Sequence, residues 1–188
     1  AELINASGVH LLSIINDLLD LSKIEAGEQE FIEGEIDISY EIHSCIRTLS
    51  SMAKENNITV QEDIPDKLLE MQGDAKIFRQ LIYNLLSNAI KYSCSDGDVT
   101  VRVKVRSDKG IDISIIDNGI GMSKEDISTA MIPFRRTVEA TNSKVVGTGL
   151  GLPLVDAFIN LFQGSFELKS EKGVGTNASI HFPKERSV

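Results

Sequence analysis

The sequence predicts an α/β sandwich, an α+β fold in which a mixed sheet packs on helices, preceded by one long bundle helix. Valine stands at every second position of residues 99–105, and isoleucine does so in residues 111–115, so two strands are expected on either side of a polar turn. Apolar stripes at helical spacing flank this hairpin. Because helices and hairpins are mixed along the chain, a doubly wound sheet is disfavoured.

The first element is the bundle helix, over residues 1–27. Its apolar residues recur at a spacing of seven in three series: Ile4, Leu11 and Leu18, then Ile14 and Leu21, then Leu12 and Leu19. This apolar face is wider than a two-stranded seam, so partners on more than one side are expected. Gly27 is typical of a helix C-terminus.

The sheet domain begins after this helix, with the boundary expected between residues 27 and 34. Residues 31–38 are predicted to form a short strand or an extended linker. Ser39 is expected to cap a helix that ends near residue 56, residues 58–60 to begin a strand, and Asp74 to cap a second helix that ends near residue 92.

Four elements are expected after the hairpin. They are a short helix over residues 123–131, a helix over residues 150–162, and strands over residues 165–170 and 176–182. The polar segment before the second of these helices is predicted to be a loop.

Composition excludes some functions. A net charge of −9 argues against a nucleic-acid surface, which needs a basic face, but a nucleotide pocket needs only a few local cations. Cys45 and Cys94 have no metal-like spacing and suggest reduced thiols in the cytoplasm. No apolar run is long enough to span a membrane, so we expect this segment to be soluble.

Glycines at 147, 149 and 151 open directly into the apolar residues of the last predicted helix. Glycine lets backbone N–H groups approach an anion, and a helix N-terminus directs its positive dipole end there, so a phosphate site is expected. The motif alone is weak, because a dinucleotide-binding glycine loop follows a strand and these glycines follow a polar segment.

Four further motifs make this signal specific, and together the five resemble the boxes of the histidine kinases. They are the N-box at residues 84–93, the first glycine box at 117–122, the phenylalanine box at 133–136, the second glycine box at 147–152 and a last glycine-rich element at 173–176. The resemblance implies the Bergerat ATP-binding fold. It also implies that residues 1–30 are the second helix of the dimerisation and phosphoacceptor hairpin with its linker, and that residues 31–188 are the catalytic ATP-binding domain.

On the second predicted helix, Asn84, Asn88 and Lys91 fall on one face. A polar stripe can be simply solvated, but the resemblance implies roles: Asn88 as the Mg²⁺ ligand, Lys91 at the phosphates and Tyr92 beside the nucleotide. The implied ATP-binding residues are Asn84, Asn88, Lys91, Tyr92, Asp117, Gly119, Gly121, Phe134, Gly147, Thr148, Gly149, Leu150, Gly151 and Thr176, and the implied catalytic residues are Asn84, Lys91 and Arg136.

Asp117 ends a predicted strand, where the resemblance makes it the reader of the adenine amino group, with Thr176 in support. The alternative is a common Asp-Asn-Gly turn. Asn84 stands where related ATPases of this fold carry a water-activating glutamate. Because an amide cannot act as a general base, slow hydrolysis and transfer of the γ-phosphate are expected.

Residues 133–146 are expected to form a lid over the triphosphate, anchored by Phe134 and supplying cations from Arg135, Arg136 and Lys144. The sequence departs from the family pattern here. The phenylalanine box usually reads Phe-Glu-Pro-Phe, whereas this chain has Met-Ile-Pro-Phe.

The function expected is therefore that of the ATP-binding domain of a two-component sensor histidine kinase. His10, His43 and His181 all lack the family's phosphoacceptor pattern, so the acceptor histidine is expected on a hairpin helix outside this chain. The expected partners are that helix, a response-regulator receiver domain and a second copy of the full-length protein. Two alternatives stay open, an ATPase of the same fold and a pseudokinase that uses ATP binding as a switch.

Overall fold

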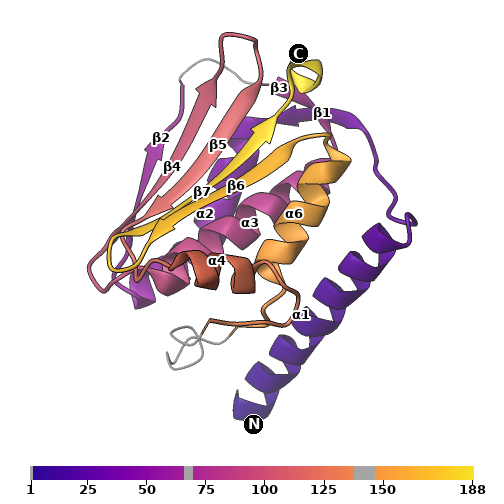
Figure 1. Cartoon of the computed structure of the whole chain (residues 1–188). Helices are drawn as coiled ribbons and strands as arrows, with labels where there is room; N and C mark the ends of the chain where they lie inside the picture. The colour runs from indigo at the N-terminus through magenta and orange to yellow at the C-terminus, as the bar shows by residue number, and fades with distance from the viewer. Residues whose placement is uncertain (1, 66–69, 138–146) are drawn as a thin grey trace.

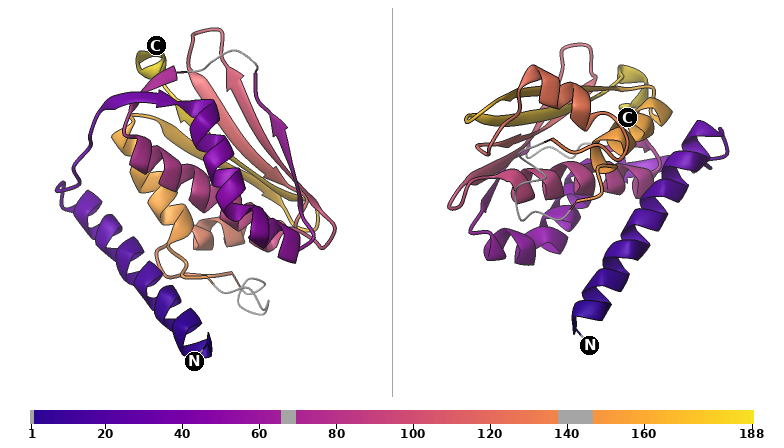
Figure 2. Two further views of the ribbon diagram at one scale, coloured as in Figure 1. Left: turned by 180° about the vertical axis from the view of Figure 1, so that it is seen from behind. Right: turned by 60° about the horizontal axis from the view of Figure 1, so that its bottom comes forward.

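The computed structural model describes residues 2–65, 70–137 and 147–188, apart from the side chains of residues 2–7, 9 and 10. Its main part is a five-stranded sheet with helices packed on one face (Figures 1 and 2). The strands are β2 (Thr59–Asp63), β4 (Asp98–Val105), β5 (Ile111–Asp117), β6 (Ser165–Glu171) and β7 (Gly175–Phe182). The predicted α/β sandwich is confirmed.

The sheet has the order β2-β4-β5-β7-β6. β2 runs parallel to β4 and every other neighbouring pair is antiparallel, so the sheet is mixed. The register of β5 and β7 sets Asp117 opposite Thr176, and that of β6 and β7 sets Ser170 opposite the same threonine. Three polar side chains therefore meet at one end of the sheet's helix-covered face.

Three helices cover the sheet: α2 (Ile38–Glu55), α3 (Ala75–Tyr92) and α6 (Gly151–Leu161) (Figure 2). α3 lies between the other two and contacts both. The short α4 (Lys124–Ala130) contacts β6 and begins with a capping box between Ser123 and Asp126. A small second sheet pairs β1 (Gly34–Asp37) with β3 (Glu70–Gly73).

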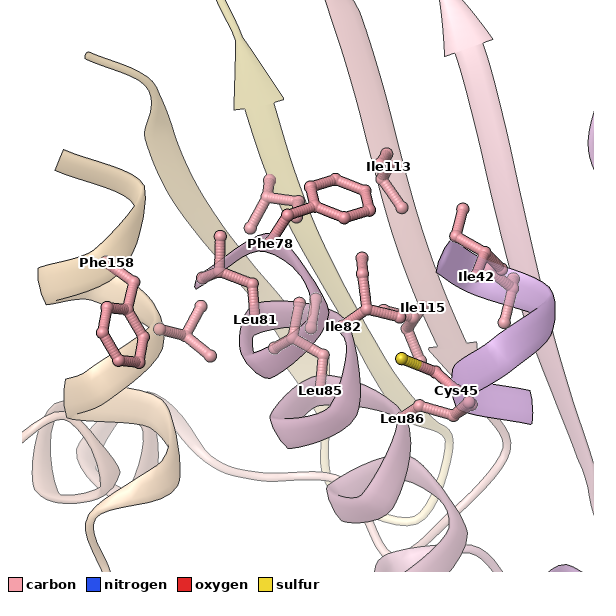
Figure 3. Close-up of a cluster of buried hydrophobic side chains, with 14 of the residues drawn as sticks. Ile42, Cys45, Phe78, Leu81, Ile82, Leu85, Leu86, Ile113, Ile115 and Phe158 are labelled. Carbon is pink, nitrogen blue, oxygen red and sulfur yellow. The ribbon is translucent and has the colours of Figure 1, made fainter. Parts of the chain in front are cut away.

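The core lies between α3 and the sheet. Figure 3 shows Phe78, Leu81, Ile82, Leu85 and Leu86 of α3 directed toward the strands and neighbouring helices, and all five are buried. Burying each of these side chains stabilises the fold by about 1.5–3 kcal/mol. The same packing fixes the rotation of α3 about its axis, and so decides where its polar residues point.

The predicted bundle helix is α1 (Glu2–Glu25), which extends away from the sheet domain toward the N-terminus (Figure 1). Gly27 follows it with a φ of 70°, as a helix stop requires. Near this end Leu21 is buried and α1 contacts α6, while Leu11, Leu12, Ile15, Leu18 and Leu19 stay exposed. No described helix is long and apolar enough to cross a membrane.

The structure corrects one sequence prediction about these elements and adds one strand that was not expected. Ser39 does not cap α2, because the carboxylate of Asp37 accepts the N–H of Tyr40 at 2.8 Å and takes the N-cap position. β3 has no counterpart among the predicted strands, because it is only four residues long and is held by pairing with β1. The predicted strands and the other helices are confirmed, with small differences at their ends.

Asp74 caps α3 as predicted, and its side chain also accepts a hydrogen bond from the segment that connects α1 to β1. Its Oδ1 accepts the N–H groups of Lys76 and Ile77 at 2.9 and 3.1 Å, while Oδ2 accepts the N–H of Ile32 at 2.9 Å. The side chain is buried, so loss of the carboxylate would leave donors without partners in a place that excludes water.

Replacing this cap should therefore destabilise the domain more than replacing an ordinary one. We expect Asp74→Ala to lower the free energy of unfolding by about 2–3 kcal/mol, because it removes both the cap and the tether to Ile32. The matched control, Asp37→Ala, removes a half-buried cap of α2 and should lower it by about 1 kcal/mol. Urea denaturation measures both, and equal losses would contradict the tethering role of Asp74.

Candidate functional site

A cavity of about 780 Å³ lies between α3, the ends of β5 and β7, and the segment that leads into α6. It is lined by twelve of the fifteen site residues that the sequence suggested. These are Asn84, Asn88, Lys91, Tyr92, Asp117, Gly121, Arg136, Gly147, Thr148, Gly149, Gly151 and Thr176. Gly119, Phe134 and Leu150 are not among its lining residues.

The polar stripe of α3 lines one wall. Asn84, Asn88 and Lys91 all face the cavity, as expected from residues spaced four and three apart on a helix. The Nδ2 atom of Asn84 is buried and makes no hydrogen bond within the described residues. A buried donor without a partner is unfavourable, so this amide favours a ligand that supplies an acceptor.

Lys91 is one of the cations of this wall, with Lys76 and Arg79. Burial lowers the pKa of its ammonium group below the ordinary value, while the nearby carboxylate of Asp17 opposes that shift. Asp17 belongs to α1, which reaches the cavity with Leu12, Ser13 and Asn16 as well. α1 is held there by a hydrogen bond from Gln80 on α3 to Asp20, at 3.1 Å.

The N-terminus of α6 forms the facing wall. Gly151 begins this helix so close to α3 that a Cβ atom there would lie 3.3 Å from Nδ2 of Asn88. Leu150 occupies the N-cap position and provides no side-chain capping bond. The first amides of α6 are therefore suited to an anion, and Asn88 and Lys91 lie on the opposite side.

Asp117 lies at the other end of the cavity. Its Oδ1 accepts the N–H groups of Gly119 at 2.9 Å and Thr176 at 3.2 Å. Burial raises the pKa of this carboxyl above its ordinary value, although the same two N–H groups lower it. With Oδ1 occupied, Oδ2 is the oxygen suited to accept a hydrogen bond from a ligand.

Gly119 supports Asp117 from behind the cavity. A Cβ atom at this position would lie 2.1 Å from the carbonyl oxygen of Tyr92, so only glycine fits between α3 and the carboxylate. The carbonyl of Tyr92 also accepts the N–H of Ile120 at 3.1 Å. The first glycine-rich segment is thus joined to the C-terminal end of α3, which sets the distance between the two ends of the cavity.

The segment predicted as a lid is only partly described, because residues 138–146, including Lys144, lie outside the described residues. Arg135 and Arg136 line the cavity. Phe134, the residue expected to anchor this segment, is 56% exposed, so its side chain is not buried there. Its backbone N–H donates to the carbonyl of Gly149 at 3.1 Å instead, so a main-chain bond joins the two motifs.

Neither His43 nor His181 lines the cavity. His43 is exposed and bonds to Glu62 at 2.7 Å, while His181 bonds to Asp112 at 2.9 Å. Burial raises the pKa of the Cys45 thiol to about 11, which keeps it protonated. Within the described residues no cluster of three His, Cys, Asp or Glu side chains could hold a metal ion. A cation in this cavity would need oxygens from a ligand.

Several lining residues were missed at the level of sequence. Leu168 and Ala178 face the cavity beside Asp117, and the alternation of their strands could have indicated this. Asn16 and Asp17 had no such signal, because their place depends on how α1 packs against the domain.

Comparison with known proteins matches this part of the chain to one family. A family model described as histidine kinase-, DNA gyrase B-, and HSP90-like ATPase matches residues 73–186, which include the whole of α3 and every strand from β4 onward.

Curated relatives extend the similarity to almost the whole chain. The chain is 37% identical over 187 residues to the non-motile and phage-resistance protein of Caulobacter vibrioides, covering 98% of this chain and 22% of that protein. It is also 37% identical to the histidine protein kinase DivJ of the same species, covering 97% and 30%, and 32% identical to the cell-division control histidine kinase PdhS of Brucella suis, covering 97% and 18%. The chain thus spans less than a third of these relatives' length.

Solved structures share the fold. The Acinetobacter baumannii histidine kinase AdeS superposes with a TM-score of 0.80 at 22% identity, covering 98% of this chain and 83% of that one. Full-length ShkA in complex with AMPPNP superposes with a TM-score of 0.83 at 24% identity, covering 95% and 36%.

The geometry of Asp117 predicts that substitution by asparagine replaces the Oδ2 acceptor with a hydrogen-bond donor. Asp117→Asn keeps an Oδ1 acceptor for Gly119 and Thr176 but places an amide donor where Oδ2 was, so we expect ATP affinity to fall by at least about a hundredfold. The fold should not lose stability. Burial raises the pKa of this carboxyl, so the charged form destabilises the fold above that pKa, and the destabilisation is relieved as the pH falls and the group becomes neutral. Asparagine is neutral at every pH and avoids this cost.

Titration calorimetry with ATP, together with thermal unfolding at pH 5 and pH 7, measures both effects. Asp112→Asn is the matched control, because Asp112 lies on the same strand with its side chain bonded to Arg106 and His181, away from the cavity. A folded Asp117→Asn protein with unchanged ATP affinity would remove Asp117 from the site.

Proposed function

Because the chain belongs to the family of histidine kinase-, DNA gyrase B-, and HSP90-like ATPases, we propose that it is the ATP-binding catalytic part of a sensor histidine kinase. The observation that favours a kinase over an ATPase is the composition of the α3 wall. At the position of Asn84 this wall carries an amide and not a carboxylate, so it offers no general base to a water molecule.

The acids among the described lining residues support the same conclusion. They are Asp117, at the far end of the cavity, and Asp17, whose carboxylate lies near enough to Lys91 to oppose the lowering of its pKa. Neither is placed as the base of a hydrolase beside Asn84. Slow hydrolysis preserves the γ-phosphate for an acceptor that another element brings to the cavity.

Each wall has a task in this proposal. Asp117 accepts the amino group of adenine, and the first amides of α6 and the side chain of Lys91 bind the phosphates. Asn88 would hold Mg²⁺ through its amide oxygen, and the buried, unpartnered Nδ2 of the neighbouring Asn84 fits a phosphate oxygen as its acceptor. When bound, Mg²⁺ supplies charge neutralisation. The protein contributes mainly position and electrostatics.

The acceptor and the partners of the whole protein are further parts of the proposal. His43 and His181 are engaged with acids away from the cavity, which favours an acceptor histidine on a hairpin helix packed against α1. The exposed side chains Leu11, Leu12, Ile15, Leu18 and Leu19 support such a helix and a second copy of the protein as partners. A response-regulator receiver domain would accept the phosphoryl group from the histidine.

The role of Asn88 predicts a loss specific to the metal complex. Asn88→Ala should weaken the binding of Mg-ATP by about tenfold or more and leave adenosine affinity nearly unchanged, because the cation ligand is removed and the base contacts remain. Calorimetric titrations with each ligand measure this, and Asn160→Ala on the exposed face of α6 is the control. Equal losses for both ligands would refute the assignment.

Phosphotransfer itself tests the function. With radiolabelled Mg-ATP and a separate hairpin fragment carrying the acceptor histidine, we expect acid-labile, base-stable label on the fragment and slow phosphate release without it. Rapid phosphate release in the absence of the fragment would favour an ATPase. ATP binding without label on the fragment would favour a pseudokinase, and label mapped to His10 would place the acceptor in this chain.

A further inference from the structure

Ser170 makes three hydrogen bonds behind the Asp117 end of the cavity. Its Oγ lies 2.9 Å from the carbonyl oxygen of Gly175, 2.8 Å from the backbone N of Met122 and 2.9 Å from Oγ1 of Thr176. No motif in the sequence singled it out, and it lies opposite Thr176 in the register of β6 and β7. Ser170 is half-buried behind residues that line the cavity.

The chemistry of these partners fixes the direction of each bond. A carbonyl oxygen only accepts, so the single O–H of Ser170 donates to Gly175. A backbone N–H only donates, so Met122 occupies one lone pair of the same oxygen. The remaining contact, between the two hydroxyls, must then be donated by Thr176 to Ser170.

These bond directions determine how the hydroxyl of Thr176 can interact with a ligand. Once its proton is directed at Ser170, its oxygen presents only lone pairs to the cavity that it lines. Thr176 lies directly opposite Asp117 in the register of β5 and β7, so the hydroxyl and the carboxylate project from the same face of the sheet as neighbours. The two oxygens together form a surface that accepts hydrogen bonds and offers none.

We propose that Ser170 is a positioning residue that determines base specificity, by fixing the Thr176 hydroxyl as an acceptor beside Asp117. An exocyclic amino group supplies two N–H donors to such a surface, whereas a carbonyl oxygen at the same position of the base meets two acceptors and no donor. The inference rests on the proposed ATP-binding function and adds a second determinant to it. Without Ser170, the Thr176 hydroxyl can rotate and donate to a carbonyl.

The test compares ATP with inosine triphosphate, which carries a carbonyl oxygen in place of the amino group and an N–H donor in place of the adjacent ring-nitrogen acceptor. We expect Ser170→Ala to lower the ratio of the inosine triphosphate Kd to the ATP Kd by about tenfold, because one donor becomes available to the carbonyl. Ser170→Thr retains the hydroxyl and should restore the ratio. Ser179→Ala, which removes another hydrogen-bonded hydroxyl from the same sheet, should leave it unchanged.

A double-mutant cycle separates positioning from a general effect on structure. In a Thr176→Val background, Ser170→Ala should produce no further change in the ratio, since the hydroxyl through which it acts is gone. A tenfold change in that background, or an unchanged ratio in Ser170→Ala alone, would overturn the inference while leaving ATP binding intact. Failure of the unmodified protein to bind ATP would overturn this inference and the proposed function together.

Discussion

The packing of α3 is the constraint on which the rest of the structure depends. One side of this helix buries Phe78, Leu81 and Ile82 against the sheet and its neighbouring helices, so the helix cannot rotate without exposing them (Figure 3). Because the helix repeats every 3.6 residues, its polar residues Asn84, Asn88 and Lys91 lie on another face, which is directed at the cavity. Asp74 caps the N-terminus of the helix, and at the other end the carbonyl of Tyr92 packs against Gly119, which supports Asp117. The position of both ends of the candidate site is therefore set by one rigid helix, α3.

The two ends of the cavity differ in how they are built. The end near α6 uses main-chain amides, a lysine and neutral amide side chains, which suit phosphate groups of varied geometry. At the end near β5, the paired strands β5, β7 and β6 hold Asp117, Thr176 and Ser170 through hydrogen bonds of 2.9–3.2 Å. A rigid register suits the recognition of a flat base, because a small shift would misalign its acceptors.

Much of this arrangement could be predicted from local sequence. The helix period alone places the polar stripe of α3, and the cap at Asp74 is predictable because its carboxylate bonds amides two and three residues away. The correction at α2 is of the same local kind, since Asp37 and Ser39 are both capping residue types and the pairing of β1 with β3 ends the strand at Asp37. The role of Ser170 depends on strand pairing, and the approach of Asp17 to Lys91 depends on the packing of α1. Those contacts join segments that are distant in the sequence, so local sequence patterns do not predict them.

The central claim is that one ligand, Mg-ATP, occupies both ends of this cavity at once. Amide hydrogen exchange of the 188-residue chain, with and without saturating Mg-ATP, tests it most directly. The account predicts slower exchange for the amides of Gly151 and Leu152 at the start of α6 and for those of Gly119 and Thr176 beside Asp117, with no change in the distant β1–β3 sheet. Protection confined to one end, or spread equally over β1 and β3, would contradict it.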